Sequence, residues 1–319
     1  MKTKHLLLLA VVFLVLLALV QGLEYFNRKE TTSRVEEFVQ ADVEQLDRIE
    51  ISYQEEFHRF GKQNNEWRLI TPLDYKLNEI NFNALLSKLE DFKTTNIISE
   101  AADKQEMFEV DQASGIRVSL YTGDLLVDDF FVGKISPDGN HTYVRQAESD
   151  QIKTARGTLR TIFNKTTNDW RDKTIWQIEP AETNRILVQR QGYEDFALAK
   201  NNEGMWQLEN TEQEPDINKV QLFVNGLFYL TAFGFVDEED LLSQLDFNDS
   251  VVQVTLTGQD GREQSLVMLE FDGKFYVQVV GSDQVFEVSR TVADNFQKQP
   301  ADLVAEQELL DETLDFEMQ

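Results

Sequence analysis

The chain of 319 residues contains no cysteine, and it has only three histidines and five prolines. The absence of cysteine excludes disulfide bonds, thiol catalysis, thiolate metal sites and a cysteine-linked lipid anchor. Basic residues are also scarce, because 57 Asp and Glu residues face 30 Lys and Arg residues, which gives a formal net charge of −27. Such a surface repels nucleic acid and anionic lipid headgroups. We interpret it as a well-solvated acidic surface, with attraction of a basic partner as the alternative.

One long apolar run is present, and it lies at the amino end. Residues 6–20 read LLLLAVVFLVLLALV, with two lysines before the run and two aromatic residues shortly after it. A helix needs about twenty residues to cross a bilayer core, and the stretch reaches that length when it is counted to Phe26. We therefore expect residues 1–29 to form a cytoplasmic stub and a transmembrane anchor. A secretory signal cleaved after Gly22 is the alternative, and both interpretations export the same part of the chain.

The exported part contains two similar stretches. The alternating segment that begins at Arg48 returns at Arg185, at an offset of 137. Further matches keep offsets between 133 and 139; they pair Trp67 with Trp206, Leu86 with Val224, Ile97 with Phe235, Ile116 with Val252, Tyr143 with Tyr276 and Phe163 with Phe296. A nearly constant offset over more than a hundred residues indicates a tandem duplication, about 48–165 and 185–298, with short loop insertions.

Each copy predicts an α+β module. Segments such as residues 48–53 and 116–121 alternate apolar and polar side chains, which is typical of half-buried strands. In residues 81–92 the apolar side chains fall at helical spacing, so a helix should cover one face of an antiparallel sheet. The predicted fold is an amino-terminal transmembrane helix followed by two tandem repeated α+β modules. The expected boundaries are 1–29 for the stub and anchor, 30–172 for the first module with its connector, 173–300 for the second module and 301–319 for an acidic tail. Residues 30–47 are expected to be a polar connector, in which the capping-box pattern Ser33-Arg-Val-Glu36 predicts a short helical turn.

Two tryptophans occupy matching positions in the two copies, at Trp67 and Trp206. A tryptophan at a strand end can stack on a sugar, or it can fill a core beneath a helix. Because both copies keep it in the same setting, we expect the core role. On that interpretation Trp67→Ala costs about 3–5 kcal/mol of stability.

No residue pattern in the sequence indicates catalysis, cofactor binding or metal binding. The three histidines, His5, His58 and His141, do not have metal-ligand spacing, and no nucleophile elbow or phosphate loop occurs. The acidic pairs and runs, Asp128-Asp129 and residues 238–240, are expected by chance among 57 acids. The Asp-Gly steps at Asp138, Asp260 and Asp272 lack a calcium-loop pattern and predict hairpin turns. We therefore expect no catalytic, cofactor-binding or metal-binding residue, and we expect that the protein is not an enzyme.

Taken together, the motifs resemble a bacterial family of unknown function, the one numbered four-three-four-zero. The resemblance covers about residues 1–300. It rests on the anchor, on Arg48-Ile-Glu-Ile51, on Trp67-Arg-Leu-Ile-Thr-Pro72 before the helix, and on Trp170-Arg-Asp-Lys173 before the second Arg-Ile strand. The second copy departs from the pattern, since Pro215 lies further from Trp206 than Pro72 does from Trp67. No catalytic or ligand residue is established for the family, so none is carried over.

The resemblance implies a setting for this protein. Family members look like envelope proteins that are often encoded beside an ABC transporter and a gliding-motility-type auxiliary subunit. We expect a single-pass protein of the bacterial inner membrane, with a cytoplasmic amino terminus and its bulk in the periplasm. It would be a non-catalytic accessory or scaffold subunit whose partners are an ABC transporter or its auxiliary subunit. The alternatives are an exported glycan- or peptidoglycan-binding protein and a hydrolase of new type.

Overall fold

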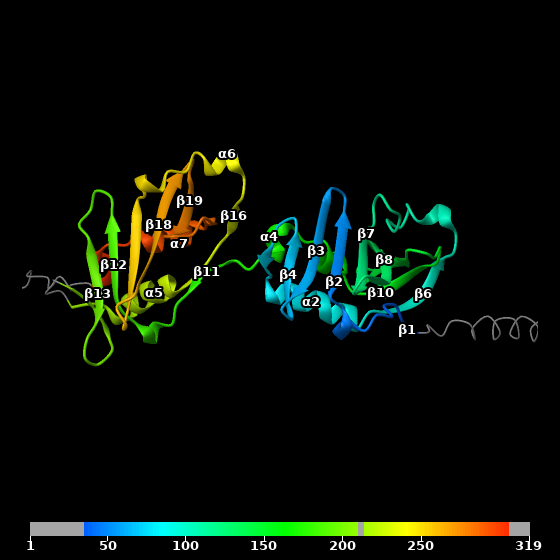
Figure 1. Cartoon of the computed structure of the whole chain (residues 1–319), viewed down its shortest axis with the longest axis horizontal. Helices are drawn as coiled ribbons and strands as arrows, with labels where there is room; N and C mark the ends of the chain where they lie inside the picture. The colour runs from blue at the N-terminus through cyan, green and yellow to red at the C-terminus, as the bar shows by residue number, and fades with distance from the viewer. Residues whose placement is uncertain (1–34, 210–213, 306–319) are drawn as a thin grey trace, which may run out of the picture. The chain divides into compact units, whose positions relative to one another are not determined.

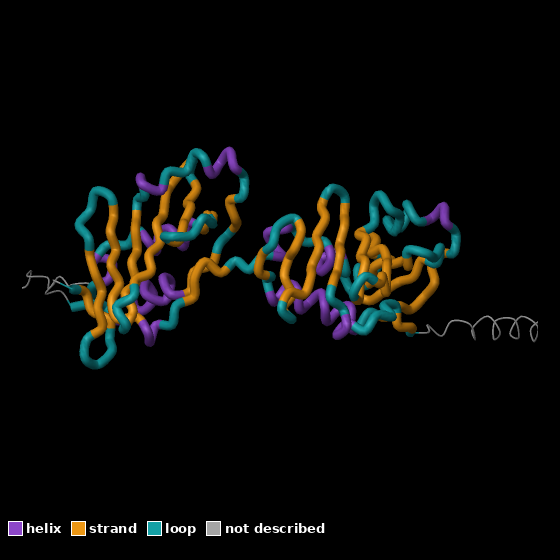
Figure 2. Tube along the Cα trace, in the orientation of Figure 1, coloured by secondary structure: helices purple, strands orange, loops and turns teal. Residues whose placement is uncertain are grey.

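The computed structural model describes residues 35–209 and 214–305. The chain divides into two compact units, one ending at Asp172 and the other beginning at Lys173, and each is described by itself. Strands dominate both units, the helices are few and short (Figure 2), and every strand pairing is antiparallel. The predicted α+β class is thus confirmed.

The predicted anchor lies outside the described residues, as does the part of the acidic tail from residue 306. Within the described residues, no helix combines the length and the apolar character that crossing a bilayer requires.

The first unit contains one sheet of ten strands, in the order β1-β6-β10-β9-β8-β7-β2-β3-β4-β5 (Figure 1). Its strands are β1 (Glu36–Glu37), β2 (Arg48–Tyr53), β3 (Glu56–Gln63), β4 (Glu66–Thr71), β5 (Tyr75–Lys76), β6 (Lys93–Ser99), β7 (Ile116–Thr122), β8 (Leu125–Ile135), β9 (His141–Gln146) and β10 (Ile152–Arg156). Its helices are η1 (Val43–Gln45), α2 (Glu79–Glu90), η2 (Ala102–Lys104), α3 (Arg160–Phe163) and α4 (Thr167–Trp170).

Helix α2 covers one face of this sheet. It begins at the N-cap Asn78, whose side chain accepts a hydrogen bond from the backbone N–H of Asn81 at 3.0 Å. Its apolar residues at helical spacing, Phe82, Leu85 and Leu89, are buried, while Ile80 is exposed. Burying a side chain of this size stabilises the fold by about 1.5–3 kcal/mol. The packing of α2 on the sheet therefore contributes much of the stability of this core.

The last residues of the first unit, from the end of α4 to Asp172, close its core. Trp170, at the end of α4, is fully buried, with its ring edge-on to Phe60 at 4.9 Å. The backbone N–H of Asn78 donates to the carbonyl of Trp170 at 2.8 Å, and that of Asp172 donates to Lys76 at 2.8 Å. These bonds fix the start of α2 to the end of the unit.

A smaller cluster lies on the other face, where the segment between β6 and β7 covers part of the sheet. Its buried members are Val110, Phe131, Tyr143 and Ile152. Gly133 on β8 makes the close approach possible, because an added Cβ would lie 2.3 Å from the carbonyl oxygen of Phe108.

The second unit contains an eight-stranded sheet, in the order β14-β13-β12-β17-β18-β19-β20-β16, and a two-stranded sheet of β11 and β15. Its strands are β11 (Thr174–Gln177), β12 (Thr183–Arg190), β13 (Phe196–Lys200), β14 (Trp206–Leu208), β15 (Tyr229–Thr231), β16 (Gly234–Val236), β17 (Val252–Gly258), β18 (Glu263–Phe271), β19 (Lys274–Val279) and β20 (Val285–Val288). Its helices are η3 (Pro180–Glu182), α5 (Ile217–Phe228), α6 (Glu239–Leu242), η4 (Phe247–Asp249), α7 (Arg290–Phe296) and η5 (Pro300–Leu303).

The two large sheets have the same strand order. Counted from β4, the first runs β4-β3-β2-β7-β8-β9-β10-β6, and each position is taken in the second by the strand numbered ten higher. The closing contact also recurs, since the N–H of Asp216, the N-cap of α5, donates to the carbonyl of the buried Leu303 at 2.9 Å. Leu303 thus takes the place that Trp170 has in the first unit.

Two expectations from the sequence need correction. A capping-box pattern at residues 33–36 predicts a helical turn, but Glu36 and Glu37 form β1, and Phe38 behind them is buried against Phe92 and Phe130. The described part of residues 30–47, which were expected to be a polar connector, therefore contributes to the core, because Phe38 and Val39 are buried.

The two matching tryptophans, predicted to be core residues, are only partly buried. Trp67 packs on Phe82 with a 5.1 Å centroid distance, and the ammonium of Lys62 lies 5.2 Å from its ring. Trp206 has the same surroundings in the second unit, with Phe228 at 6.0 Å and the Lys200 ammonium at 5.0 Å. Each indole therefore covers the border of a core.

Candidate functional site

The two described histidines do not form a catalytic arrangement. His58, on β3, is buried, and its Nε2 lies 3.0 Å from the Thr167 hydroxyl. Burial lowers the pKa of His58 to about 4, so the ring is neutral at physiological pH. A neutral histidine bonded to a hydroxyl inside a core is explained by packing alone. The third, His5, lies outside the described residues.

His141 is part of a serine–aspartate–histidine cluster in the turn between β8 and β9. The ring Nδ1 lies 2.6 Å from an Asp138 oxygen, and the hydroxyl of Ser136 donates to the same carboxylate. These bonds, with the backbone N–H of Asn140, hold the pKa of Asp138 well below its ordinary value. Because the serine bonds the acid and not the histidine, no base is positioned to activate a nucleophile. The cluster stabilises a turn.

The acidic residues singled out in the sequence are separated by the fold. Asp128 and Asp129 are neighbours on β8, so their side chains lie on opposite faces of the sheet. Asp128 accepts a hydrogen bond from the backbone N–H of Gln40 at 2.7 Å, whereas Asp129 accepts two from Arg117 at 2.7 and 3.0 Å. They cannot share a proton or a substrate. Glu238, Glu239 and Asp240 are exposed at the start of α6.

The predicted hairpin turns at three Asp-Gly steps are confirmed. Gly139, Gly261 and Gly273 all have positive φ angles, between 71° and 79°, and they lie between consecutive antiparallel strands. Within residues 35–209 and 214–305, no group of three or more His, Asp or Glu side chains is arranged to hold a metal ion.

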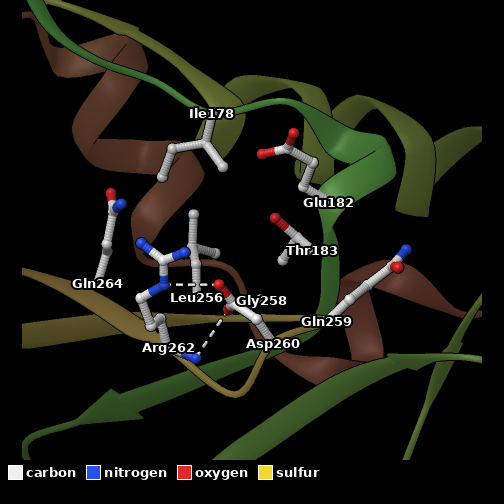
Figure 3. A pocket seen from close by; sticks show the side chains of 9 residues that line it. All are labelled: Ile178, Glu182, Thr183, Leu256, Gly258, Gln259, Asp260, Arg262 and Gln264. Carbon is white, nitrogen blue, oxygen red and sulfur yellow. Dashed lines mark hydrogen bonds and ion pairs between the residues drawn. The ribbon is translucent and has the colours of Figure 1, made fainter.

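A hollow in the second unit is a candidate for a binding site. Its volume is about 340 Å³, and it lies between the η3 segment and the hairpin of β17 and β18 (Figure 3). Its lining residues are Ile178, Glu182, Thr183, Leu256, Gly258, Gln259, Asp260, Arg262 and Gln264. The volume is at the lower end of the range for ligand pockets, about 300–1,000 Å³.

Most of the residues that line the hollow are polar, and its apolar side chains come from Ile178 and Leu256. Thr183 and Leu256 are buried and Ile178 is half-buried, while Gln264 is exposed and its side chain has no hydrogen-bond partner among the described residues. On the rim, Asp260 accepts hydrogen bonds from the backbone N–H of Arg262 at 3.0 Å and from its Nε at 2.5 Å. These bonds lower the pKa of Asp260 and keep it charged. The arrangement can hold an apolar group and one hydrogen bond, but it offers no reactive group.

No residue pattern in the sequence indicates this hollow. Ile178, Leu256 and Gln264 belong to no functional motif, and they come from two segments, residues 178–183 and 256–264, that are far apart in the chain. A signal was present in the spacing of the repeat, because the segment before the Arg-Ile strand differs in length between the two copies.

A second surface of interest is the outer edge of β6 in the first unit. Its first two residues, Lys93 and Thr94, pair with β1. Beyond them, the outer side of residues 95–99 faces no other strand within the described parts of the chain, although the inner side pairs with β10. Ile97 and Ile98 on this edge are 50% and 44% exposed.

An α+β protein of two sheet-rich units, with no reactive constellation in its described residues, is the class that these features define. The model of the family described as Domain of unknown function (DUF4340) matches residues 67–248, and the chain belongs to that family. No curated protein and no solved structure matches the chain. The predicted family membership is therefore confirmed.

Proposed function

We propose that this protein is a non-catalytic accessory subunit that holds a polypeptide partner in an envelope complex. In this proposal residues 1–29 anchor it in the bacterial inner membrane as a single-pass protein with a cytoplasmic amino terminus. Two tandem units that arose by duplication project into the periplasm. The partner is an ABC transporter or its auxiliary subunit. The equal strand order of the two sheets supports the duplication.

The observation that carries the proposal is the open edge of β6. An edge strand exposes unpaired N–H and C=O groups, which another chain can extend by adding a strand. Ile97 and Ile98 give this edge apolar side chains, and Lys93, which pairs with Glu37 and Asp91, is the charged residue at its start. An edge of this kind favours a protein partner over a small ligand.

The second unit shows that the exposure is particular to the first. At the offset of 138, Phe235 and Val236 stand where Ile97 and Ile98 do, and they are 8% and 3% exposed. Val236 is packed against the leucines of the segment around α6, and Phe235 against Phe286. Both strands thus lie at the edge of their sheets, but the apolar side chains on that edge are buried in the second unit and exposed in the first.

The test is purification of the tagged full-length protein from membranes in a mild detergent, after in-cell crosslinking. We expect ABC-transporter subunits to accompany the wild type. Ile97→Lys should abolish their recovery, because a charged edge disfavours strand addition. Val280→Lys is the matched control, since Val280 is similarly apolar, 59% exposed and in the other unit. Recovery of the protein alone at native expression, or equal recovery with Ile97→Lys, would overturn the proposal.

The glycan-binding alternative depends on exposed aromatic rings. Trp67 and Trp206 both carry a lysine ammonium near the ring and an aromatic neighbour beside it, so part of each ring is already occupied. Sedimentation with insoluble peptidoglycan tests this alternative directly. Retention that is lost in a Trp67→Leu variant would favour it over the accessory role.

A further inference from the structure

The hollow in the second unit has a filled counterpart in the first. In the first unit Leu120 pairs with Asp128 across β7 and β8, and Leu120 also pairs with Ile49 on β2. In the second unit Leu256 pairs with Gln264 across β17 and β18, and Leu256 pairs with Ile186 on β12. The two leucines, and the two polar residues opposite them, therefore hold the same positions in their sheets.

In the first unit the space beside Leu120 and Asp128 is filled by the segment that joins β1 to η1. Five residues, Phe38 to Asp42, separate β1 from η1. Within this segment Val39 is 8% exposed, Ala41 packs against the core cluster, and the N–H of Gln40 donates to Asp128 at 2.7 Å. A short extended stretch thus covers the hairpin with small apolar side chains and fixes itself by one backbone hydrogen bond.

In the second unit the corresponding segment is shorter. Only Ile178 and Glu179 separate β11 from η3. Thr183 follows η3 where the larger Leu46 follows η1, and both are buried. The missing residues and the smaller side chain leave the hollow, and Gln264 lacks the bond that the connector gives to Asp128.

We propose that the hollow receives an extended segment of the partner polypeptide, in the manner in which the first unit receives its own Val39-Gln40-Ala41. Small apolar side chains lie on Ile178 and Leu256, and a backbone N–H of the segment donates to the side-chain oxygen of Gln264. This inference rests on the proposed accessory function and adds a second contact to the β6 edge.

The charge of the rim restricts the segment. Glu182 and Asp260 outnumber Arg262, and Arg262 is already paired with Asp260. The whole chain carries −27. Since like charges suppress association, the segment is neutral or basic.

The probe is the neutral tetrapeptide acetyl-Phe-Val-Gln-Ala-amide, which has the sequence of residues 38–41. Binding to the full-length protein in detergent is followed by saturation-transfer NMR on the peptide. We expect saturable binding, weakened about three- to tenfold by Gln264→Ala, which removes one hydrogen bond. Ile178→Trp should abolish binding by filling the hollow. Gln253→Ala is the control, because Gln253 is a glutamine on the neighbouring strand β17 that does not line the hollow.

A second peptide isolates the hydrogen bond. Acetyl-Phe-Val-Pro-Ala-amide has no N–H at the position of Gln40, so its binding should fall to the level of the Gln264→Ala variant. Unchanged near-ultraviolet circular dichroism checks that each variant is folded. Failure to saturate at millimolar peptide, or equal binding to the wild type and to Ile178→Trp, would overturn the proposal.

The outcome is separable from that of the accessory function. Co-purification of transporter subunits without peptide binding leaves the accessory role in place and removes the hollow from it. Peptide binding without any co-purified subunit establishes the hollow as a peptide site and removes the transporter as the partner.

Discussion

The two units share a sheet and differ in what covers it. In the first, the connector fills the end of the β7–β8 hairpin, and the segment after β6 approaches the sheet through backbone at Gly133. In the second, the connector is short, and the segment after β16 covers the sheet with the side chains of Leu241, Leu242 and Leu245. The same arrangement of paired strands, the frame, is thus compatible with different covering segments, the covers.

The difference in the covering segments shows where the two units can differ in function. The frame is specified by many paired strands and by cores that tolerate little change in volume. The covers contact the frame on one side only, so a shorter segment or a different side chain opens a surface without disrupting the sheet. The hollow in the second unit and the open edge of β6 in the first are two surfaces of this kind.

The largest expected effect concerns the residue that closes each core. Trp170→Ala should destabilise the first unit by about 3–5 kcal/mol, and Leu303→Ala the second by about 2–4 kcal/mol, because both side chains are fully buried. Peptide-resolved hydrogen exchange reports each unit separately. Loss of protection in both units to the same degree after either substitution would show that the two cores do not behave as separate clusters.

A pH effect should be present in the first unit and absent from its counterpart. His58 keeps a pKa of about 4 when folded, against 6.5 in an unfolded chain. Between these values only the unfolded state takes up the proton, so stability falls as pH drops from about 6.5 to 4 and then levels off. The loss is on the order of 3 kcal/mol. Urea unfolding of wild type and His58→Gln from pH 4.5 to 7.5 measures it, and parallel curves for the two proteins would contradict the assignment.

Two closely packed glycines, one in each unit, should respond differently to an added methyl group. Gly133→Ala places a Cβ against backbone and against Val110, so we expect a loss of about 1–3 kcal/mol. Gly226→Ala in α5 meets the flexible side chain of Asn295, and better helix propensity offsets the displaced contact to within about 1 kcal/mol. Thermal unfolding compares them, with Gly234→Ala as the control because no atom lies near its added Cβ. A neutral Gly133→Ala would show that the cover is mobile.

The smallest effect concerns the ion pairs on the open sheet faces. Asp129 is 12% exposed and accepts hydrogen bonds from Arg117 and Ser119, so Asp129→Asn should cost about 1 kcal/mol. Glu209 is 31% exposed and paired with Arg185, so Glu209→Gln should lower the stability by less than about 0.5 kcal/mol. Chemical unfolding at low and at 0.5 M salt measures both, and a larger loss for Glu209→Gln would reverse the expected order.

Much of the frame could be predicted from local patterns. Alternation at Ile49 and Ile51 indicated β2, the spacing of Leu85 and Leu89 indicated α2, and the Asp-Gly steps indicated hairpin turns. Each of these features is decided by residues that are close in sequence. The half-burial of Trp67 was not predictable, because it depends on how far Phe82 and Lys62 cover the indole.

The sequence by itself determined the α+β class of the fold, regular elements such as β2, β7 and α2, the family and the lack of thiol chemistry. Periodicity, composition and spacing are properties of the chain alone. Only the tertiary structure decided that Asp128 and Asp129 face apart, that the β6 edge is open, and that a hollow forms where Ile178, Leu256 and Gln264 meet. These features depend on which distant segments pack together and on how much volume they fill, and neither quantity is written in any single stretch of residues.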